Sequence, residues 1–504
     1  MCYAGLDVGT TGVKAMCFDA NGNTVAYAYR DYPLLTPRDG WCELDPLQIW
    51  SACKEALTEM AKKADRPIRS LAVSSPAQAV VPLDHAGTPL YNFMTTVDSR
   101  TVKQHQWWLE NADEFHFLQR TGLPFSSIYT VNKIMWLREN MPKLWEKVWK
   151  FLCVEDYITW NLTGETVIDL SLAARGMLFN TKEKCWDEEV LQLAGISASQ
   201  LSHIAPAGTP VGPLRPGLAE ELGLDSALQV VVGAHDQTCG SIGCGLLYPG
   251  QAMNATGTVE VLETISPVFP APEKLMKYHY PCSPYAAGNG YLMMSINQSG
   301  GLLLKWYRDT FCQWETYCAK QEGIDPYTYI VNSSSPEISD VYVLPHLNGA
   351  ETPIQDPQSA GAIVHLRSCH TKADITRGVL DSLAYELRLN LEAFEDIGRP
   401  ITEIRAIGGG ARSPKLLQIK ADVCQRPVLA MQVSESAALG AAIIGAVGIG
   451  AFPTYDQAIS AMVKTGAVYQ PNSDLKAAYD LRYAEYKQLY PSLRQLNHSI
   501  AARM

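Results

Sequence analysis

The sequence predicts a mixed α/β protein made of two similarly built halves. Strand-like runs and helix-like periodicities both occur along the chain, as is typical of α/β proteins. An apolar run, a tight turn of Gly and Thr, and a second apolar run occur at residues 3–18 and again at 250–265. This weak repeat, about half a chain apart, indicates two related halves. The length of 504 residues allows about two to four domains, and the repeat favours two large ones.

The composition excludes several classes of protein. Hydrophobic residues make up 47% of the chain and charged residues 18%, so there is enough apolar side chain for large cores and disorder cannot dominate. A net charge of −11 without a long basic run argues against binding to nucleic acid or to an anionic membrane surface. The most apolar stretch, residues 437–452, is too short and too rich in glycine to span a membrane. Because the N-terminus lacks the regions of a signal peptide, we expect a soluble cytoplasmic protein.

The thirteen cysteines do not form a recognisable framework. No Cys-x-x-Cys pair is present, and the closest pairs, Cys239 with Cys244 and Cys312 with Cys318, do not have the spacing of zinc ligands. An odd number of scattered cysteines predicts reduced thiols, with neither disulfides nor a metal site.

In the first half, the alternation of apolar residues predicts strands at 3–8, 13–18, 24–32, 68–74 and 79–83. A helix is expected to begin after Asp45, which can cap it, with Pro46 at the first helical position and Gln48 three residues after the cap. Helical periodicity runs from 132 to 150 and is broken at Pro142.

The pattern restarts near residue 230. Strands are predicted at 229–233, 250–253, 259–265 and 403–407, and helices at 372–397 and 414–424. Gly398 and Pro400 end the first of these helices. No low-complexity linker marks a boundary, so the division into domains 1–246 and 247–504 is inferred from this restart.

The first candidate site is the turn after residue 8. Asp7 ends a predicted strand and could hold Mg²⁺, while backbone N–H groups and hydroxyls of the turn could surround a phosphate; the turn residues are Gly9, Thr10 and Thr11. An ordinary hairpin has the same composition. The second turn, Gly257-Thr258, favours phosphate binding over an ordinary hairpin, because two such turns on two halves suit a nucleotide held between them.

Two further segments could carry chemistry. Gly408-Gly409-Gly410-Ala411 lies between a strand and a helix and would let a flat group approach the backbone, although a tight connection between elements explains it equally well. In His235-Asp236-Gln237, the carboxylate follows a strand and could act as a general base on an alcohol, with Gln237 bonding substrate hydroxyls. The structural alternative is that Asp236 caps a helix and that His235 only forms structural hydrogen bonds. The tryptophans of 107–108 and 136–149 are expected in cores.

Together these segments resemble the FGGY family of carbohydrate kinases over nearly the whole chain. The N-terminal matches are GLDVGTTGVKA (5–15), GWCELDPLQIW (40–50), KIMWLREN (133–140) and GAHDQTCGSIGCG (233–245). The C-terminal matches are NATGTVE (254–260), LPHLNGAETPIQDP (344–357), AIGGGARSPKLLQIKADVCQRPV (406–428) and ESAALGAAIIGAVGIGAF (435–452). Ile128 and the pair Ala350-Glu351 depart from the residues that are usual at those positions.

The resemblance implies a two-domain actin/hexokinase/Hsp70-like (ribonuclease H-like) ATPase fold, with ATP and Mg²⁺ in a cleft between the domains. It implies that Asp236 is the general base and that Asp7 and Asp236 hold the metal. The residues implied around the phosphates are Gly9, Thr10, Thr11, Gly257 and Thr258. Those implied at the adenosine are Gly409, Gly410 and Ala411, and those implied at the sugar are Gln78, Asp98, Arg100 and Gln237. Lys14 matches a common family position, but no role is assigned to it.

The substrate is less well defined. The long C-terminal matches resemble the xylulokinase-like branch, whereas Pro76-Ala77-Gln78 and Thr96 to Arg100 depart from that branch. A histidine before the aspartate, as at His235, is similar to the L-fuculose and L-rhamnulose kinases. A glutamine after it, as at Gln237, is similar to the glycerol kinases. We expect a ketose kinase that acts on a pentulose such as xylulose. The alternatives are a 6-deoxyhexulose kinase such as L-fuculokinase, and then a glycerol or tetritol kinase.

A protein of another class, an actin-like or Hsp70-like ATPase that switches a binding partner, shares the implied fold. Asp236 and Gln237 beside Asp98 and Arg100 favour the kinase, because a partner-switching ATPase has no use for sugar-side residues. We expect a small-molecule sugar as the partner, and a homodimer is left open.

Overall fold

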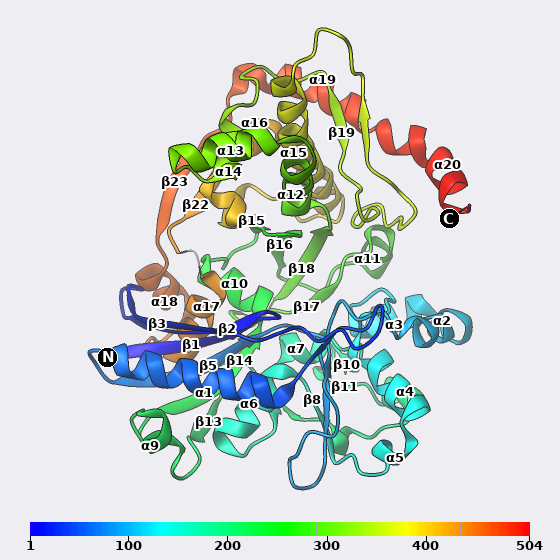
Figure 1. Ribbon diagram of the computed structural model, residues 1–504. Helices are drawn as coiled ribbons and strands as arrows, with labels where there is room; N and C mark the ends of the chain where they lie inside the picture. The colour runs from blue at the N-terminus through cyan, green and yellow to red at the C-terminus, as the bar shows by residue number, and fades with distance from the viewer. Residues whose placement is uncertain (289, 434, 504) are drawn as a thin grey trace.

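Two β-sheets, one in each half of the chain, form the framework of the protein (Figure 1). The structure is a computed structural model, and it describes residues 1–288, 290–433 and 435–503. The two-domain α/β class predicted from the sequence is confirmed.

The sheet of the N-terminal half has six strands in the order β13-β14-β5-β1-β2-β3. Their bounds are β1 Cys2–Val8, β2 Gly12–Asp19, β3 Thr24–Asp31, β5 Ile68–Ser75, β13 Pro210–Pro213 and β14 Gln229–His235. Strands β1, β2 and β3 form an antiparallel meander, while β5 runs parallel to both β1 and β14. Five strands predicted from apolar alternation are therefore present in this half, with bounds that differ by one or two residues.

The sheet of the C-terminal half has seven strands in the order β17-β18-β16-β15-β21-β22-β23. Their bounds are β15 Gln251–Thr256, β16 Glu260–Ser266, β17 Cys282–Pro284, β18 Tyr291–Asn297, β21 Glu403–Gly408, β22 Val428–Met431 and β23 Thr465–Tyr469. An antiparallel meander β15-β16-β18 lies beside the parallel strands β21 and β22. This repeats the arrangement of β1-β2-β3 beside β5 and β14, so the weak sequence repeat corresponds to two sheets of one topology.

The strand β15 extends further than predicted. The strand is predicted to end at residue 253, yet it continues through Asn254 to Thr256, and 257–259 form the turn. The Nζ of Lys420 lies 2.8 Å from Oδ1 of Asn254 and 2.9 Å from Oγ1 of Thr256. Because a distant lysine satisfies these polar groups, they can lie inside the sheet.

Helix α1 (Pro46–Lys63) begins as predicted. The carboxylate of Asp45 accepts hydrogen bonds from the backbone N–H groups of Leu47 and Gln48, and Pro46 occupies the first turn. The predicted helix at 132–150 is shorter than expected. It consists of α4 (Thr130–Asn140) and α5 (Pro142–Trp145), and Lys150 already belongs to strand β8 (Lys150–Leu152). Pro142 cannot continue a helix and starts a new short one.

Helices α10 (Asp236–Gly243) and α17 (Ser436–Gly448) lie between the sheets (Figure 1). Helix α17 comes from the C-terminal half but packs on β1 and β5 of the N-terminal sheet. The two helix backbones touch, because a Cβ atom added at Gly440 would lie 1.8 Å from the carbonyl oxygen of Cys239. Helix α10, which begins at Asp236, is therefore fixed against both halves of the protein.

The other face of the N-terminal sheet is covered by α1 and by α6 (Val154–Thr163), which bury a shared apolar core with the sheet. In the C-terminal half, α15 (Lys372–Asp396) and α16 (Pro414–Cys424) pack on each other over a second large core. The predicted helix bounds hold within one residue at each end of both helices.

The remaining elements complete the two halves. In the N-terminal half they are β4 Glu43–Leu44, β6 Val81–Leu83, β7 Phe93–Met94, α2 Val102–Asn111, α3 Glu114–Thr121, β9 Val167–Ile168, α7 Leu170–Ala174, β10 Phe179–Asn180, β11 Cys185–Trp186, α8 Glu188–Ala194, β12 His203–Ile204 and α9 Leu218–Leu222. In the C-terminal half they are α11 Pro272–Tyr278, α12 Gly300–Phe311, α13 Gln313–Glu322, α14 Pro326–Asn332, β19 Tyr342–Leu344, β20 Ala362–Val364, α18 Tyr455–Met462, α19 Lys476–Tyr486 and α20 Leu489–Ala501.

The thirteen cysteines are free thiols. Trp108 is buried and meets Trp107 edge to face, with ring centroids 5.3 Å apart. Within the described part of the chain, no helix combines the length and the apolar character that crossing a membrane requires.

Candidate active site

Parallel strands bring the predicted catalytic residues to one edge of the N-terminal sheet. Asp7 of β1 is the register partner of Ser74 in β5, and Ser75 is the partner of His235, the last residue of β14. The carboxyl ends of β1, β5 and β14 therefore lie side by side, and Asp236 follows directly after β14. In open α/β sheets, ligands bind at this edge.

Asp7 is held in a largely buried position at this edge. Oγ of Ser74 donates to its Oδ1 at 2.9 Å, and Nζ of Lys14 lies 4.0 Å from its Oδ2. Burial and the nearby negative charge of Asp236 raise the pKa of Asp7 to about 6. A carboxylate that is costly to ionise alone gains from a cation beside it, which is consistent with the predicted role in metal binding.

Asp236 is the first residue of α10, and the cap of this helix is His235. No side-chain capping bond to the helix is formed among the described residues, so the alternative in which Asp236 caps α10 does not describe this structure. Instead, Oδ1 of Asp236 lies 3.0 Å from Nε2 of His235. The Asp236 side chain is 32% exposed, so its carboxylate is open to a ligand.

Buried polar residues hold the end of β14 in place. The backbone N–H of His235 donates to Oγ of Ser171 at 3.1 Å, and the backbone N–H of Gly233 donates to Oε1 of Glu155 at 2.8 Å. The carboxylate of Asp169 accepts from the N–H groups of Ser171 and Leu172 and caps α7. Burial raises the pKa of Glu155 well above its usual range. Sequence reasoning missed these residues, although acidic groups within apolar segments such as 152–158 could have indicated them.

Gln78 lies in a left-handed backbone conformation, with φ of 66°, in the loop that follows β5. Its carbonyl oxygen accepts hydrogen bonds from Nζ of Lys133 at 2.8 Å and from Oγ1 of Thr130 at 3.3 Å. When its side-chain amide donates to the carbonyl of Ala77, its Oε1 lies 3.2 Å from Nε and Nη2 of Arg175. Sequence reasoning missed Arg175, which brings a buried positive charge next to this predicted sugar contact.

Asp98 and Arg100 form a sealed ion cluster. Nη2 of Arg100 lies 2.6 Å from Oδ2 of Asp98 and 2.7 Å from Oε1 of Glu43, and the two partners' side chains are 0% and 5% exposed. The guanidinium of Arg100, itself 1% exposed, lies 3.7 Å from the ring centroid of Trp41. These groups tie neighbouring loops together and present no free side-chain surface. Their contact with a sugar stays a prediction, as does that of the half-buried Gln237 beside Asp236.

A pocket of about 440 Å³ lies in the C-terminal half. It brings together the second Gly-Thr turn and the glycine-rich segment, because β15 and β21 are parallel and Thr256 is the register partner of Gly408. The lining residues are Thr256, Gly257, Thr258, Gly301, Leu302, Leu304, Lys305, Asp325, Tyr327, Thr328, Val331, Gly409, Gly410, Arg412, Ser413 and Leu416. Gly408 has φ of 79°, and a Cβ there would lie 2.8 Å from the carbonyl oxygen of Thr256, so only glycine fits.

Two predicted groups lie elsewhere. Ala411 does not line this pocket and packs against the core of the C-terminal half. The first turn forms the hairpin between β1 and β2, closed by a hydrogen bond from the N–H of Gly9 to the carbonyl of Gly12 at 2.9 Å. Thr10 and Thr11 are exposed at its tip. The two Gly-Thr turns thus belong to different halves of the protein, as predicted.

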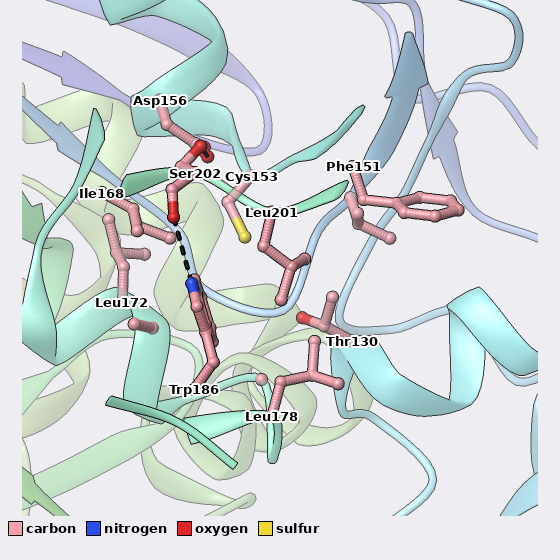
Figure 2. Close-up of a pocket in the computed structure, with 13 residues that line it drawn as sticks. Thr130, Phe151, Cys153, Asp156, Ile168, Leu172, Leu178, Trp186, Leu201 and Ser202 are labelled. Atoms are coloured by element: carbon pink, nitrogen blue, oxygen red, sulfur yellow. Dashed lines mark hydrogen bonds between the residues drawn. The ribbon is translucent and has the colours of Figure 1, made fainter. Parts of the chain in front are cut away.

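A small cavity lies within the N-terminal half (Figure 2). Its volume of about 20 Å³ suits one water molecule and cannot hold a sugar. Thr130 and Asp156 line it, and Oγ of Ser202 donates to Oδ2 of Asp156 at 2.5 Å. The dashed line in Figure 2 is the hydrogen bond from Nε1 of Trp186 to the Ser202 carbonyl, at 3.1 Å. Burial raises the pKa of Asp156 to about 7.

The carboxylates at the edge of the N-terminal sheet suit Mg²⁺. Within the described ranges, no three His, Cys, Asp or Glu side chains form a group that could hold a metal. Mg²⁺ commonly binds one or two carboxylates and completes its shell with phosphates and water, so Asp7 and Asp236 fit this cation as a pair.

Comparisons with known proteins cover both halves of the chain. The model for the N-terminal domain of the FGGY family of carbohydrate kinases matches residues 2–243, and the model for the C-terminal domain matches 253–449. A xylulose kinase from Staphylococcus epidermidis is 26% identical over 98% of this chain and 97% of its own length. A gluconokinase from Bacillus subtilis is 29% identical over 94% of this chain and 93% of its own length.

Solved structures agree with the fold. A ligand-bound xylulose kinase from Lactobacillus acidophilus has a TM-score of 0.90 at 25% identity, covering 99% of each chain. A gluconate kinase from the same organism has a TM-score of 0.88 at 25% identity, covering 97% of each chain.

Proposed function

Because the chain belongs to the FGGY family of carbohydrate kinases, we propose that it transfers the γ-phosphoryl group of ATP to a hydroxyl of a ketose, with a pentulose such as xylulose as the first candidate. Phosphotransfer to a sugar follows from the family, and the choice of ketose rests on the xylulose kinase relatives. A partner-switching ATPase, which the fold alone would allow, is set aside because the family is one of carbohydrate kinases.

The observation that carries the mechanism is the position of Asp236. Its carboxylate stands at the carboxyl end of a parallel strand, is partly exposed, and is oriented by His235 at 3.0 Å. In the proposed reaction, Asp236 accepts the proton of the sugar hydroxyl as that oxygen attacks the phosphorus. The contact of the His235 imidazole with Oδ1 of Asp236 orients the carboxylate before the sugar arrives, which lowers the cost of reaching the reactive geometry.

The phosphates are proposed to bind between the two Gly-Thr turns. Backbone N–H groups near Gly9 and Gly257 and the hydroxyls of Thr10, Thr11 and Thr258 are the donors that this role requires. Gly409 and Gly410 would leave room for the adenosine, whereas Ala411 would act only through the core. Asp7 and Asp236 would hold Mg²⁺, which when bound would neutralise charge on the phosphates.

A second substrate class, an aldonate such as gluconate, is favoured by one observation. The buried guanidinium of Arg175 lies next to Gln78, and a cation there complements a substrate carboxylate better than it complements a neutral ketose. The gluconokinase relatives agree with this alternative. The 6-deoxyhexuloses and then glycerol or tetritols follow as further candidates.

A coupled assay of ADP formation tests the proposal. The panel contains xylulose and other pentuloses, gluconate, L-fuculose and L-rhamnulose analogues, glycerol and tetritols, each with MgATP. We expect the highest kcat/KM with a pentulose, and a preference for gluconate would replace the ketose by the aldonate. ATP hydrolysis that no member stimulates would contradict the proposed substrates. Size measurement in solution and cell fractionation test the homodimer and the cytoplasmic location, which stay predictions.

A further inference from the structure

Two lysines are almost completely buried in the part of the chain that the structure describes. Lys133 is 0% exposed and belongs to α4 of the N-terminal half, whereas Lys420 is 1% exposed and belongs to α16 of the C-terminal half. Burying a lysine is costly, and apolar side chains of similar volume usually stabilise a core at least as well. Their hydrogen-bond partners therefore indicate what each lysine is for.

Lys420 binds the base of the second Gly-Thr turn. Its Nζ donates to Oδ1 of Asn254 at 2.8 Å, to Oγ1 of Thr256 at 2.9 Å, and to the carboxylate of Glu260. Thr256 also donates to Glu260 at 3.0 Å. Asn254 and Thr256 lie at the end of β15, and Glu260 is the first residue of β16. The Nζ of Lys420 therefore links the two strands on either side of the Gly257-Thr258 turn.

Lys420 also connects that turn to helix α16, which lines another part of the same pocket. Helix α16 follows the glycine-rich segment, and the start of this helix region supplies Ser413 and Leu416 to the pocket lining. One side chain of α16 thus ties that helix to the two strand ends that flank the second Gly-Thr turn.

Lys133 holds the loop on the sugar side. Its Nζ donates to the carbonyl of Gln78 at 2.8 Å, in the loop where Gln78 adopts φ of 66°. A left-handed conformation is costly for a glutamine and persists only where neighbouring groups enforce it. Burial lowers the pKa of Lys133 to about 7, so the amine is a donor in either protonation state.

We propose that Lys420 and Lys133 are positioning residues, each serving one substrate: Lys420 sets the turn that receives the nucleotide phosphates, and Lys133 sets the Gln78 loop that receives the sugar. This inference rests on the proposed function, because it assigns each lysine to one of the two proposed sites. Neither lysine touches a reacting atom.

The test for Lys420 uses a double variant that keeps the core neutral. Lys420→Met alone would leave the Glu260 carboxylate buried without its partner and could unfold the chain, so Lys420→Met is combined with Glu260→Gln. We expect the Kd for MgADP by calorimetry and the KM for ATP to rise about tenfold or more, while the KM for the sugar stays within about twofold of wild type.

The test for Lys133 is the single variant Lys133→Met, since this lysine bonds a carbonyl and no carboxylate. We expect the KM for the best sugar of the panel to rise about tenfold, with the Kd for MgADP unchanged. The matched control is Arg377→Met with Asp381→Asn. This pair is a buried ion pair of α15, with side chains 6% and 2% exposed, that does not line the pocket. It should lower thermal stability and leave both affinities unchanged.

Each lysine variant serves as a control for the other. The Lys420 variant should weaken only nucleotide binding, and the Lys133 variant should raise only the KM for the sugar. If both variants raise both constants equally, or lower only the unfolding temperature as the control does, the positioning roles are wrong. If wild type phosphorylates no sugar, the proposed function fails, but the calorimetry with MgADP still decides the role of Lys420. A sugar kinase whose affinities do not respond to either variant would overturn this inference and leave the function intact.

Discussion

The imidazole Nε2 of His235 lies 3.0 Å from Oδ1 of Asp236, so the last residue of β14 orients the carboxylate that begins α10. The backbone of His235 is in turn fixed by Ser171. One carboxylate oxygen is thereby engaged, while the partly exposed side chain keeps the other available to a ligand. This contact with its neighbour in sequence gives the Asp236 carboxylate a defined orientation, as the proposed role of a base requires.

Replacement of His235 should lower kcat more than it changes substrate affinity. In His235→Phe the ring volume remains but the close polar contact between Nε2 and Oδ1 of Asp236 is lost, and we expect kcat to fall roughly tenfold to a hundredfold. His235→Gln can still donate from its amide and should retain more activity. Steady-state kinetics with the best sugar measure the effect, and equal rates for wild type and His235→Phe would show that the pairing is incidental.

Because α10 and α17 cross in close contact, alanine substitution should affect the stability of the fold differently at Gly440 and at Gly240. Gly440→Ala would place a Cβ 1.8 Å from the carbonyl of Cys239 and force the helices apart, which should destabilise the fold by about 3 kcal/mol or more. Gly240→Ala on α10 meets only ordinary contacts, the nearest at 3.5 Å, and should be neutral or stabilise the helix by up to about 1 kcal/mol. Urea unfolding of the two variants measures the difference. Similar midpoints would mean that the close helix contact does not matter.

Asp156 predicts how stability depends on pH. Burial raises its pKa from 3.8 to about 7, so the folded state holds a proton that the unfolded state releases. The resulting stability is fully present below pH 3.8 and is lost as the pH rises through about 7. In Asp156→Asn the side chain cannot ionise, so the variant does not lose this stability as the pH rises. The free energy of unfolding of the variant, relative to wild type, should therefore rise by roughly 2–3 kcal/mol between pH 5 and pH 8. A pH-independent difference would refute the buried ionisation.

The pocket of the C-terminal half predicts a variant that blocks nucleotide. A side chain at Gly409 has room in the fold, because an added Cβ meets only the Thr256 carbonyl at 3.8 Å, but a leucine there would occupy the pocket. Gly409→Leu should weaken MgADP binding at least about tenfold by calorimetry. Ala411→Gly, which changes a residue that packs on the core, should leave that affinity near the wild-type value.

The sequence predicted the fold well where local patterns carry the information. The meander β1-β2-β3, the cap at Asp45 and the helix α15 follow from alternation, capping chemistry and helical period. The extension of β15 through Asn254 and Thr256 could not be predicted locally, because it depends on Lys420, which lies far along the chain. In the segment 132–150 the break at Pro142 was predicted from the sequence. The short helix that follows it and the start of β8 at Lys150 were not predicted.

The site was only partly predictable for a related reason. Asp7, Asp236 and the two Gly-Thr turns stand at strand ends, and a sequence pattern reveals strand ends. Lys133 and Lys420 lie within segments that resemble the family, but nothing in those segments shows that each is buried against a distant loop or turn, and Arg175 lies outside every quoted motif. Asp98 and Arg100 were singled out by resemblance, but the structure places them in a sealed cluster whose members mainly bind one another.

The most direct measurement compares wild type with Asp236→Asn in the coupled assay, using the best sugar of the panel and saturating MgATP. Asparagine keeps the shape of the side chain but cannot accept the hydroxyl proton. We predict that phosphorylated sugar forms at least about a thousandfold more slowly, while calorimetry with ADP in the absence of Mg²⁺ shows unchanged binding, since Asp236 is proposed to hold the metal and not the nucleotide. Turnover by Asp236→Asn within a few fold of wild type would contradict the assignment of Asp236 as the base.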